Sequence, residues 1–149
     1  TLRYGMIKPD LDKIITFDLT KSLSLEGDTA PYIQYTGARA SRILEKAGIS
    51  PNFDIPFDLL NNEFEAELVK MIGLFGIQIR DSTNNLSPKV IAKYCYNLAV
   101  SFNAFYEHVK VIDSGNEVLT NARLCLVSSF KSTLEKALNL LGIPSPERM

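Results

Sequence analysis

Apolar and polar positions recur with the period of a helix along Glu26–Lys46, EGDTAPYIQYTGARASRILEK. At roughly 100° per residue, the segment separates into two stripes. The first is apolar or small, as suits packing against another helix, and comprises Ile33, Thr36, Gly37, Ala40, Ile43, Leu44 and, just beyond the segment, Ala47. The second comprises Tyr32, Tyr35, Arg39, Arg42 and Lys46. We call it the aromatic–basic stripe and expect it to lie off the core face of the helix.

Capping and turn-forming residues divide the rest of the chain into further helical segments. The candidate caps and stops are Pro9, Asp18, Gly27, Asp28 or Thr29, Gly48, Asn61 or Asn62, Ser87–Pro88 and Gly142. The expected helices cover residues 1–8, 18–27, 32–47, 62–79, 88–108 and 117–141, with loops or turns at 50–56, 81–86 and 114–116. Strand-like alternation is limited to one candidate, Ile14–Phe17. The pattern predicts an all-α fold, an antiparallel helical bundle with short connections.

The composition is that of an ordinary globular domain. The chain has 149 residues, 46% hydrophobic and 22% charged, enough for one substantial core. It contains no apolar run of about 18 residues, which excludes a transmembrane helix, and no signal-peptide pattern. Cys95 and Cys125 fall on expected helices, where buried reduced thiols are the default, although a disulfide between them stays open. The net charge of −1 argues against a general nucleic-acid binder, so any RNA contact has to be local.

The residues needed for an active site are scarce. His108 is the single histidine, so most metal and acid–base arrangements lack a second imidazole. A pair between His108 and Cys125 is conceivable, but a surface histidine near a helix end fits the pattern better. Glu63, Glu65 and Glu67 are expected to form a solvated face. No glycine-rich loop has phosphate-binding spacing, so this chain is not expected to catalyse a reaction alone.

The aromatic–basic stripe is the most coherent candidate for binding. Flat rings can stack on bases and cations can hold phosphates, which together suit single-stranded RNA. The same pattern also fits a half-buried tyrosine pair beside an ordinary solvated basic face. A third interpretation is a helical protein–protein interaction module whose tyrosine face binds a partner helix. The nearly neutral charge of the chain supports that third interpretation.

Several segments, taken in order, resemble the C-terminal anticodon-binding (DALR) domain of arginyl-tRNA synthetases. The entry segment is SLEGDTAPYIQYTGAR at Ser24–Arg39, preceded by TLRYGMIK at Thr1–Lys8 and ITFDL at Ile15–Leu19. A central segment, KVIAKYCYNLAVSFNAFYEH, covers Lys89–His108. The final segments are NARLCLV at Asn121–Val127 and LLGIPSPERM at Leu140–Met149. The resemblance implies the all-α class I synthetase anticodon-binding architecture.

The resemblance also implies a parent enzyme, an ATP-dependent arginine–tRNA ligase with ATP and Mg²⁺ as its cofactors. This chain alone is expected to carry no cofactor, metal or catalytic residue, because the resemblance places the HIGH and KMSK signatures upstream of Thr1. Residues 1–27 are expected to connect an absent catalytic domain to a helical anticodon-binding domain at 28–149. The expected partners are arginine tRNA and the parent's catalytic domain, without membrane or DNA. The expected location is the cytoplasm.

The expected tRNA-binding residues are Tyr32, Tyr35, Arg39, Arg42, Tyr106 and Met149. By their positions in the matching motifs, Tyr32, Tyr35 and Arg39 supply stacking and phosphate or base contacts. Tyr106 adds a ring from the central helix, and Met149 brings the terminal carboxylate toward the same RNA loop. The sequence departs from the family at Gly37, where many relatives have histidine. This glycine costs about 0.5–1 kcal/mol of helix stability relative to alanine, and we expect the departure to affect tRNA affinity more than the fold.

Overall fold

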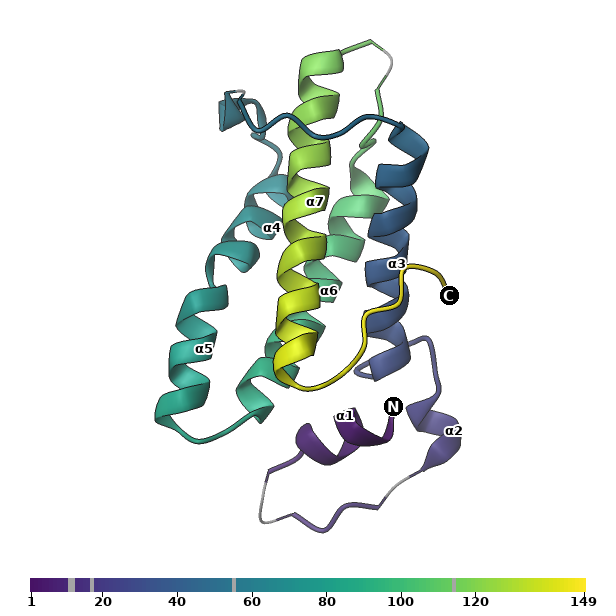
Figure 1. Cartoon of the computed structure of the whole chain (residues 1–149), viewed down its shortest axis with the longest axis vertical. Helices are drawn as coiled ribbons and strands as arrows, with labels where there is room; N and C mark the ends of the chain where they lie inside the picture. The colour runs from purple at the N-terminus through teal and green to yellow at the C-terminus, as the bar shows by residue number, and fades with distance from the viewer. Residues whose placement is uncertain (11–12, 17, 55, 114) are drawn as a thin grey trace.

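Helices account for the regular secondary structure of the computed structural model, which describes residues 1–10, 13–16, 18–54, 56–113 and 115–149 (Figure 1). In chain order they are α1 (Leu2–Ile7), α2 (Leu19–Ser22), α3 (Ala30–Ala47), the 3₁₀ turn η1 (Phe57–Leu59), α4 (Glu63–Gly73), α5 (Phe75–Asn84), α6 (Lys89–His108) and α7 (Glu117–Leu140). The predicted all-α class is confirmed. The candidate strand is wrong for residues 14–16, and Phe17 lies outside the described residues.

The chain reverses direction between α3, the pair α4 and α5, α6 and α7. In Figure 1, α3 runs upward, α4 and α5 return downward, α6 runs upward and α7 runs downward. Both α3 and α4 pack against the central pair formed by α6 and α7. The predicted antiparallel bundle is therefore confirmed. This arrangement also places α3 directly beside α6, which matters for the candidate site.

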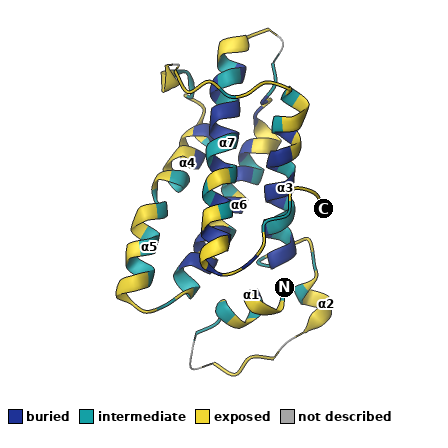
Figure 2. Cartoon of the chain, in the orientation of Figure 1, coloured by how far each residue is buried: buried dark blue, intermediate teal, exposed yellow. Residues whose placement is uncertain are grey.

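The core lies along the facing sides of α6 and α7, which are dark blue in Figure 2. Phe102 of α6 stacks on Phe130 of α7 with ring centroids 4.0 Å apart. The other large side chains that are fully buried include Ile33, Leu68, Leu98, Phe105, Leu124, Leu134 and Leu138. Each such side chain contributes about 1.5–3 kcal/mol relative to an exposed one. This shared core fixes α3 and α6 relative to each other.

Local signals in the sequence set most of the helix ends. The side chain of Asp18 accepts a hydrogen bond from the Lys21 amide at 3.1 Å, and that of Thr29 accepts one from the Tyr32 amide at 3.2 Å. Asn62 begins α4 with a capping box. Gly48 ends α3 in the left-handed conformation at φ 65°, which glycine adopts without steric cost. These predicted caps are confirmed.

The segment predicted as one helix over 62–79 is instead two helices, α4 and α5, which meet at Leu74. Gly73 immediately precedes the break and contributes no side chain to hold the turn. The predicted polar connection at 81–86 is wrong for residues 81–84, which continue α5 to Asn84. The Thr83 hydroxyl donates to the Ile79 carbonyl at 2.9 Å, so a polar side chain satisfies a helical carbonyl here.

Two shorter predictions also change at their boundaries. The helix expected over 18–27 ends at Ser22, where the Ser22 hydroxyl donates back to the Asp18 carbonyl at 2.6 Å. The helix expected to begin with a Ser87 cap has Pro88 at its N-cap position and no side-chain cap bond. The one-residue shift at Pro88 is within the usual variation of helix ends, whereas the earlier end at Ser22 shortens the predicted helix by more than one turn.

The residues of α1 and Lys8 contact the end of the bundle where α3 begins and α7 ends. Tyr4 is buried and its hydroxyl donates to the Asp28 carboxylate at 2.6 Å. Burial is the main reason that the pKa of Tyr4 lies above its usual value. The Lys8 ammonium donates to the Asp28 carbonyl at 2.7 Å, and the Arg3 guanidinium donates to the Gly142 carbonyl. Residues before α3 thus contact both its start and the end of α7.

The cysteines are buried free thiols, in agreement with the default prediction. Burial raises the pKa of Cys95 to about 12. The Cys125 thiol lies 3.2 Å from the Asn52 carbonyl oxygen. His108 is exposed, and its ring stacks on Phe64 with centroids 4.2 Å apart. The surface histidine predicted at a helix end is therefore confirmed.

Candidate nucleic-acid interface

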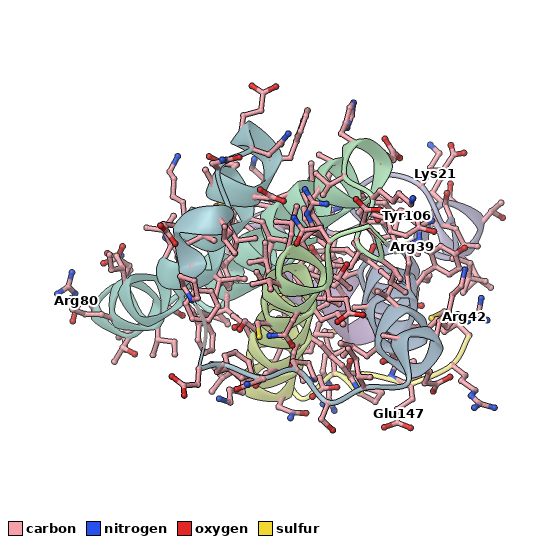
Figure 3. The ribbon with its side chains drawn as sticks, turned by 90° about the horizontal axis from the view of Figure 1, so that it is seen from above. Lys21, Arg39, Arg42, Arg80, Tyr106 and Glu147 are labelled. Carbon is pink, nitrogen blue, oxygen red and sulfur yellow. The ribbon has the colours of Figure 1, made fainter. Side chains whose placement is uncertain are left out.

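A small hollow of about 220 Å³ opens where α3 faces α6. Its lining comprises Tyr35, Ala38, Arg39, Arg42, Ile43, Lys46 and Tyr106. Successive turns of α3 supply most of these residues because positions three and four apart share a helix face. Tyr106 comes from α6, and Figure 3 shows its side chain close to Arg39. The structure therefore brings four of the six predicted residues, Tyr35, Arg39, Arg42 and Tyr106, into one pocket.

Arg39 lies at the centre of this pocket. Its guanidinium carbon is 5.1 Å from the centroid of the Tyr35 ring and 4.7 Å from that of Tyr106. Both distances are within the range of a cation–π interaction. Nη1 of Arg39 also donates to Oδ1 of Asn103 at 2.8 Å. Arg39 is half-buried, which corrects the expectation that the whole stripe lies off the core face: the helix is close enough to α6 for Arg39 to reach Asn103.

The positive charge of Arg39 is not neutralised within the described part of the chain. No carboxylate there lies within 4.0 Å of its guanidinium nitrogens. Its partners are instead a neutral amide and two aromatic rings. Arg42 and Lys46, both exposed, add two more cations to the same pocket. The pocket thus combines exposed ring surface with positive charge, although the chain as a whole is nearly neutral.

Tyr32 lies outside this pocket. Its ring is tilted against that of Tyr96, with centroids 5.8 Å apart. Its hydroxyl accepts a hydrogen bond from Nδ2 of Asn103 at 2.8 Å. The structure therefore places Tyr32 in a polar contact between α3 and α6.

Met149 reaches the neighbourhood of the pocket through the C-terminal tail. Nη2 of Arg42 donates to the Met149 carbonyl oxygen at 3.0 Å. Nearer the start of the tail, Nε2 of Gln34 donates to the Pro144 carbonyl at 2.7 Å. The tail consequently runs from the end of α7 back along α3, as Figure 1 shows. Met149 is 48% exposed, so its side chain is open to an approaching molecule.

Gly37 is buried where α3 approaches both α7 and the tail. A Cβ atom at this position would lie 3.3 Å from Cδ2 of Leu134 and 3.6 Å from Oγ of Ser145. The first of these distances is shorter than an ordinary van der Waals contact. The absence of a side chain at Gly37 therefore permits this close approach.

Asn103 and Lys46 were not among the predicted site residues. Lys46 is the last residue of the aromatic–basic stripe, and it was omitted because the predicted site residues on α3 stopped at Arg42. Asn103 precedes Tyr106 by one turn of α6, so the two residues share a face. It is also a polar residue between Phe102 and Phe105, both of which are buried. A polar residue between two buried phenylalanines, one turn from Tyr106, was the signal that could have identified Asn103. Its partner Arg39, however, is 64 residues away in the sequence.

The prediction that Glu63, Glu65 and Glu67 form a solvated face is partly wrong. Glu63 and Glu67 are exposed as expected, whereas Glu65 is fully buried. One oxygen of Glu65 accepts from Nε of Arg123 at 2.7 Å, and the other accepts from the Asn62 amide at 3.0 Å. The ion pair and the helix cap together compensate for the burial of this charge.

Comparison with known proteins identifies the family. The family model described as the DALR anticodon binding domain matches residues 33–149. The chain belongs to this family.

None of the helices in the described ranges has the length and apolar content that crossing a membrane requires.

The related proteins are arginine–tRNA ligases. The chain is 40% identical to the arginine–tRNA ligase of Borrelia hermsii and 39% identical to that of Methanothrix thermoacetophila. Each match covers 99% of this chain but only 26% of the relative. The chain therefore spans about a quarter of the length of the curated relatives it matches.

Solved structures agree with these relatives. The arginyl-tRNA synthetase of Thermus thermophilus superposes with a TM-score of 0.88 at 36% identity, over 99% of this chain and 26% of that one. The arginyl-tRNA synthetase of Plasmodium falciparum gives a TM-score of 0.87 at 30% identity, with the same coverage. The helical arrangement described above is thus that of a segment of these synthetases.

Proposed function

We propose that this DALR domain binds the anticodon loop of arginine tRNA in the pocket between α3 and α6. The observation that carries the proposal is the environment of Arg39, a cation held beside two tyrosine rings without a carboxylate partner among the described residues. Unstacked bases of an RNA loop can lie on such rings while the cations hold their phosphates. Tyr35, Tyr106 and Arg39 supply the main contacts, and Arg42 and Met149 extend them along the tail.

The genetic code gives this pocket a simple task. Every arginine codon has G in the middle, so every cognate anticodon has C there. A pocket that recognises this one base serves all arginine tRNAs. The geometry supports this role because Tyr35, Arg39 and Tyr106 come from two helices and converge on a single small hollow.

The proposal includes the parent enzyme. The relatives named arginine–tRNA ligase support a larger parent protein that attaches arginine to tRNA. We further propose that this parent acts in the cytoplasm and that its catalytic domain uses ATP and Mg²⁺. In that protein residues 1–27 connect the catalytic domain to the module at 28–149. The alternative of a helical protein–protein interaction module receives no support from the relatives.

A change of the tRNA tests the proposal. The complete ligase is assayed with arginine tRNA and with a transcript whose middle anticodon base is U in place of C. We expect KM for the altered tRNA to rise by about tenfold or more, because one or two hydrogen bonds to the base edge are lost. Equal KM values for the two tRNAs would show that this base is not recognised. A tRNA altered in the acceptor stem controls for damage to catalytic contacts elsewhere.

A further inference from the structure

Asn103 links the RNA-facing pocket to the interior of the bundle. Its side chain is half-buried on α6 and contacts three side chains of α3. Oδ1 accepts from Arg39 at 2.8 Å, while Nδ2 donates to the Tyr32 hydroxyl at 2.8 Å and to Oγ1 of Thr36 at 3.1 Å. All the hydrogen-bonding groups of the amide are therefore engaged with one neighbouring helix.

The chemistry of the partners fixes the orientation of the amide. A guanidinium group can only donate hydrogen bonds, so the oxygen of Asn103 has to face Arg39. The Thr36 hydroxyl already donates its proton to the Tyr32 carbonyl at 2.9 Å, which leaves it as an acceptor for Nδ2. The Tyr32 hydroxyl accepts the second N–H. Two hydroxyl groups on α3 thereby direct the Asn103 oxygen toward Arg39.

Asn103 therefore orients the Arg39 guanidinium without neutralising its positive charge. A guanidinium has five N–H donors, and the bond to Asn103 uses one of them. Because Asn103 is uncharged, Arg39 keeps its full positive charge for a phosphate or a base edge. A carboxylate at position 103 would hold Arg39 equally well, but it would cancel the charge that RNA binding needs.

We propose that Asn103 is a positioning residue for tRNA binding, which orients the Arg39 guanidinium in the pocket and is itself oriented by the hydroxyl groups of Tyr32 and Thr36. The inference rests on the proposed function, because Arg39 has to contact the RNA for its orientation to matter. Pre-orientation strengthens binding by reducing the conformational freedom that the side chain loses in the complex.

A double-mutant cycle in the complete ligase tests this role. The variants are Asn103→Ala, Arg39→Ala and the double variant, and the readouts are KM and kcat for arginine tRNA. We expect Asn103→Ala to raise KM by about five- to tenfold with kcat within about twofold, which corresponds to the loss of one typical hydrogen bond. In the Arg39→Ala background, the same change should alter KM by less than about twofold, since both changes remove one interaction.

Asn97→Ala is the matched control. Asn97 lies on the same helix but is exposed and lines grooves beside α4, so the control changes the same residue type with the same gain in helix propensity. If Asn103→Ala fails to fold, Tyr32→Phe takes its place in the cycle, because it keeps the ring against Tyr96 and removes only the hydroxyl. We expect Tyr32→Phe to raise KM by less than Asn103→Ala does. In the Arg39→Ala background, Tyr32→Phe should leave KM unchanged.

The outcomes separate the two proposals. If Arg39→Ala raises KM but Asn103→Ala behaves like Asn97→Ala, the positioning role is wrong and the proposed function stands. Independent, multiplying effects of Asn103 and Arg39 would also overturn the positioning role. If neither Arg39→Ala nor the change of the middle anticodon base raises KM, the proposed function itself fails.

Discussion

Two arginines, Arg39 and Arg123, join helices of this bundle in opposite ways. Arg123 on α7 donates Nε to the Glu65 carboxylate at 2.7 Å and Nη1 to the Lys110 carbonyl at 2.9 Å. The side chains of Arg123 and Glu65 are only 15% and 1% exposed. Arg39 instead contacts two tyrosine rings and the neutral amide of Asn103 in an open pocket.

The difference shows how partners decide the role of a cation. The buried carboxylate of Glu65 neutralises the positive charge of Arg123, so that charge has little remaining attraction for a ligand. The Arg123 side chain instead connects α7 to α4 and to the loop after α6. The Arg39 guanidinium is oriented by Asn103, but no carboxylate among the described residues neutralises its charge. We therefore expect Arg123 to contribute mainly to stability and Arg39 mainly to ligand binding.

The largest expected effect is on stability and comes from Arg123→Ala. This change leaves the Glu65 carboxylate buried without its counter-charge, so the free energy of unfolding should fall by about 3–5 kcal/mol. Urea denaturation of the chain measures the loss. Arg80→Ala is the control, because Arg80 is exposed on α5 and points away from the bundle (Figure 3). Equal stability of the two variants would show that the buried pair does not hold the fold together.

The second effect is on binding and comes from Arg39→Ala. We expect the affinity for arginine tRNA to fall by about tenfold or more, because a charge-assisted contact is lost. The free energy of unfolding should fall by only about 1 kcal/mol, the typical contribution of the bond to Asn103. Filter binding and urea denaturation measure the two quantities. A large loss of stability with unchanged affinity would place Arg39 in the same class as Arg123.

The third effect tests the rings beside Arg39. Tyr35→Leu should weaken tRNA binding by about 5- to 150-fold, since stacking of a base on an aromatic ring contributes roughly 1–3 kcal/mol. Tyr35→Phe keeps the ring and should retain most of the affinity. If Phe is as damaging as Leu, the hydroxyl group and not the ring makes the contact. Circular dichroism of both variants separates a binding defect from altered helix packing.

The smallest effect is expected at Arg42, which is exposed and shared between the pocket and the tail. Arg42→Ala should weaken tRNA binding by less than about fivefold, because exposed charge interactions contribute at most about 1 kcal/mol. The same binding assay compares it with Arg39→Ala. A larger loss at Arg42 than at Arg39 would move the centre of the site toward the tail.

Local features could be predicted from the sequence, and contacts between distant segments could not. The caps at Asp18, Thr29 and Asn62 depend on residues within a few positions, so their patterns identify them. The same holds for the aromatic–basic stripe, because the helical period alone places Tyr35 and Arg39 on one face. The family resemblance added Tyr106 from α6.

The remaining features depend on packing between helices. Glu65 looked solvated because its partner Arg123 is 58 residues away. Tyr32 lies at the helical spacing of the stripe, yet its hydroxyl contacts Asn103 because α6 passes close to the start of α3. The break at Leu74 likewise separates two helices whose combined apolar period continues through it.

The salt dependence of tRNA binding tests the central claim most directly. Binding constants of the complete ligase and its Arg39→Ala variant are measured over a series of monovalent salt concentrations. If Arg39 holds a phosphate of the anticodon loop, the log–log slope of the variant should be shallower by about 0.7–1, because one fewer counterion is released. Identical slopes and identical affinities for the two proteins would contradict the account.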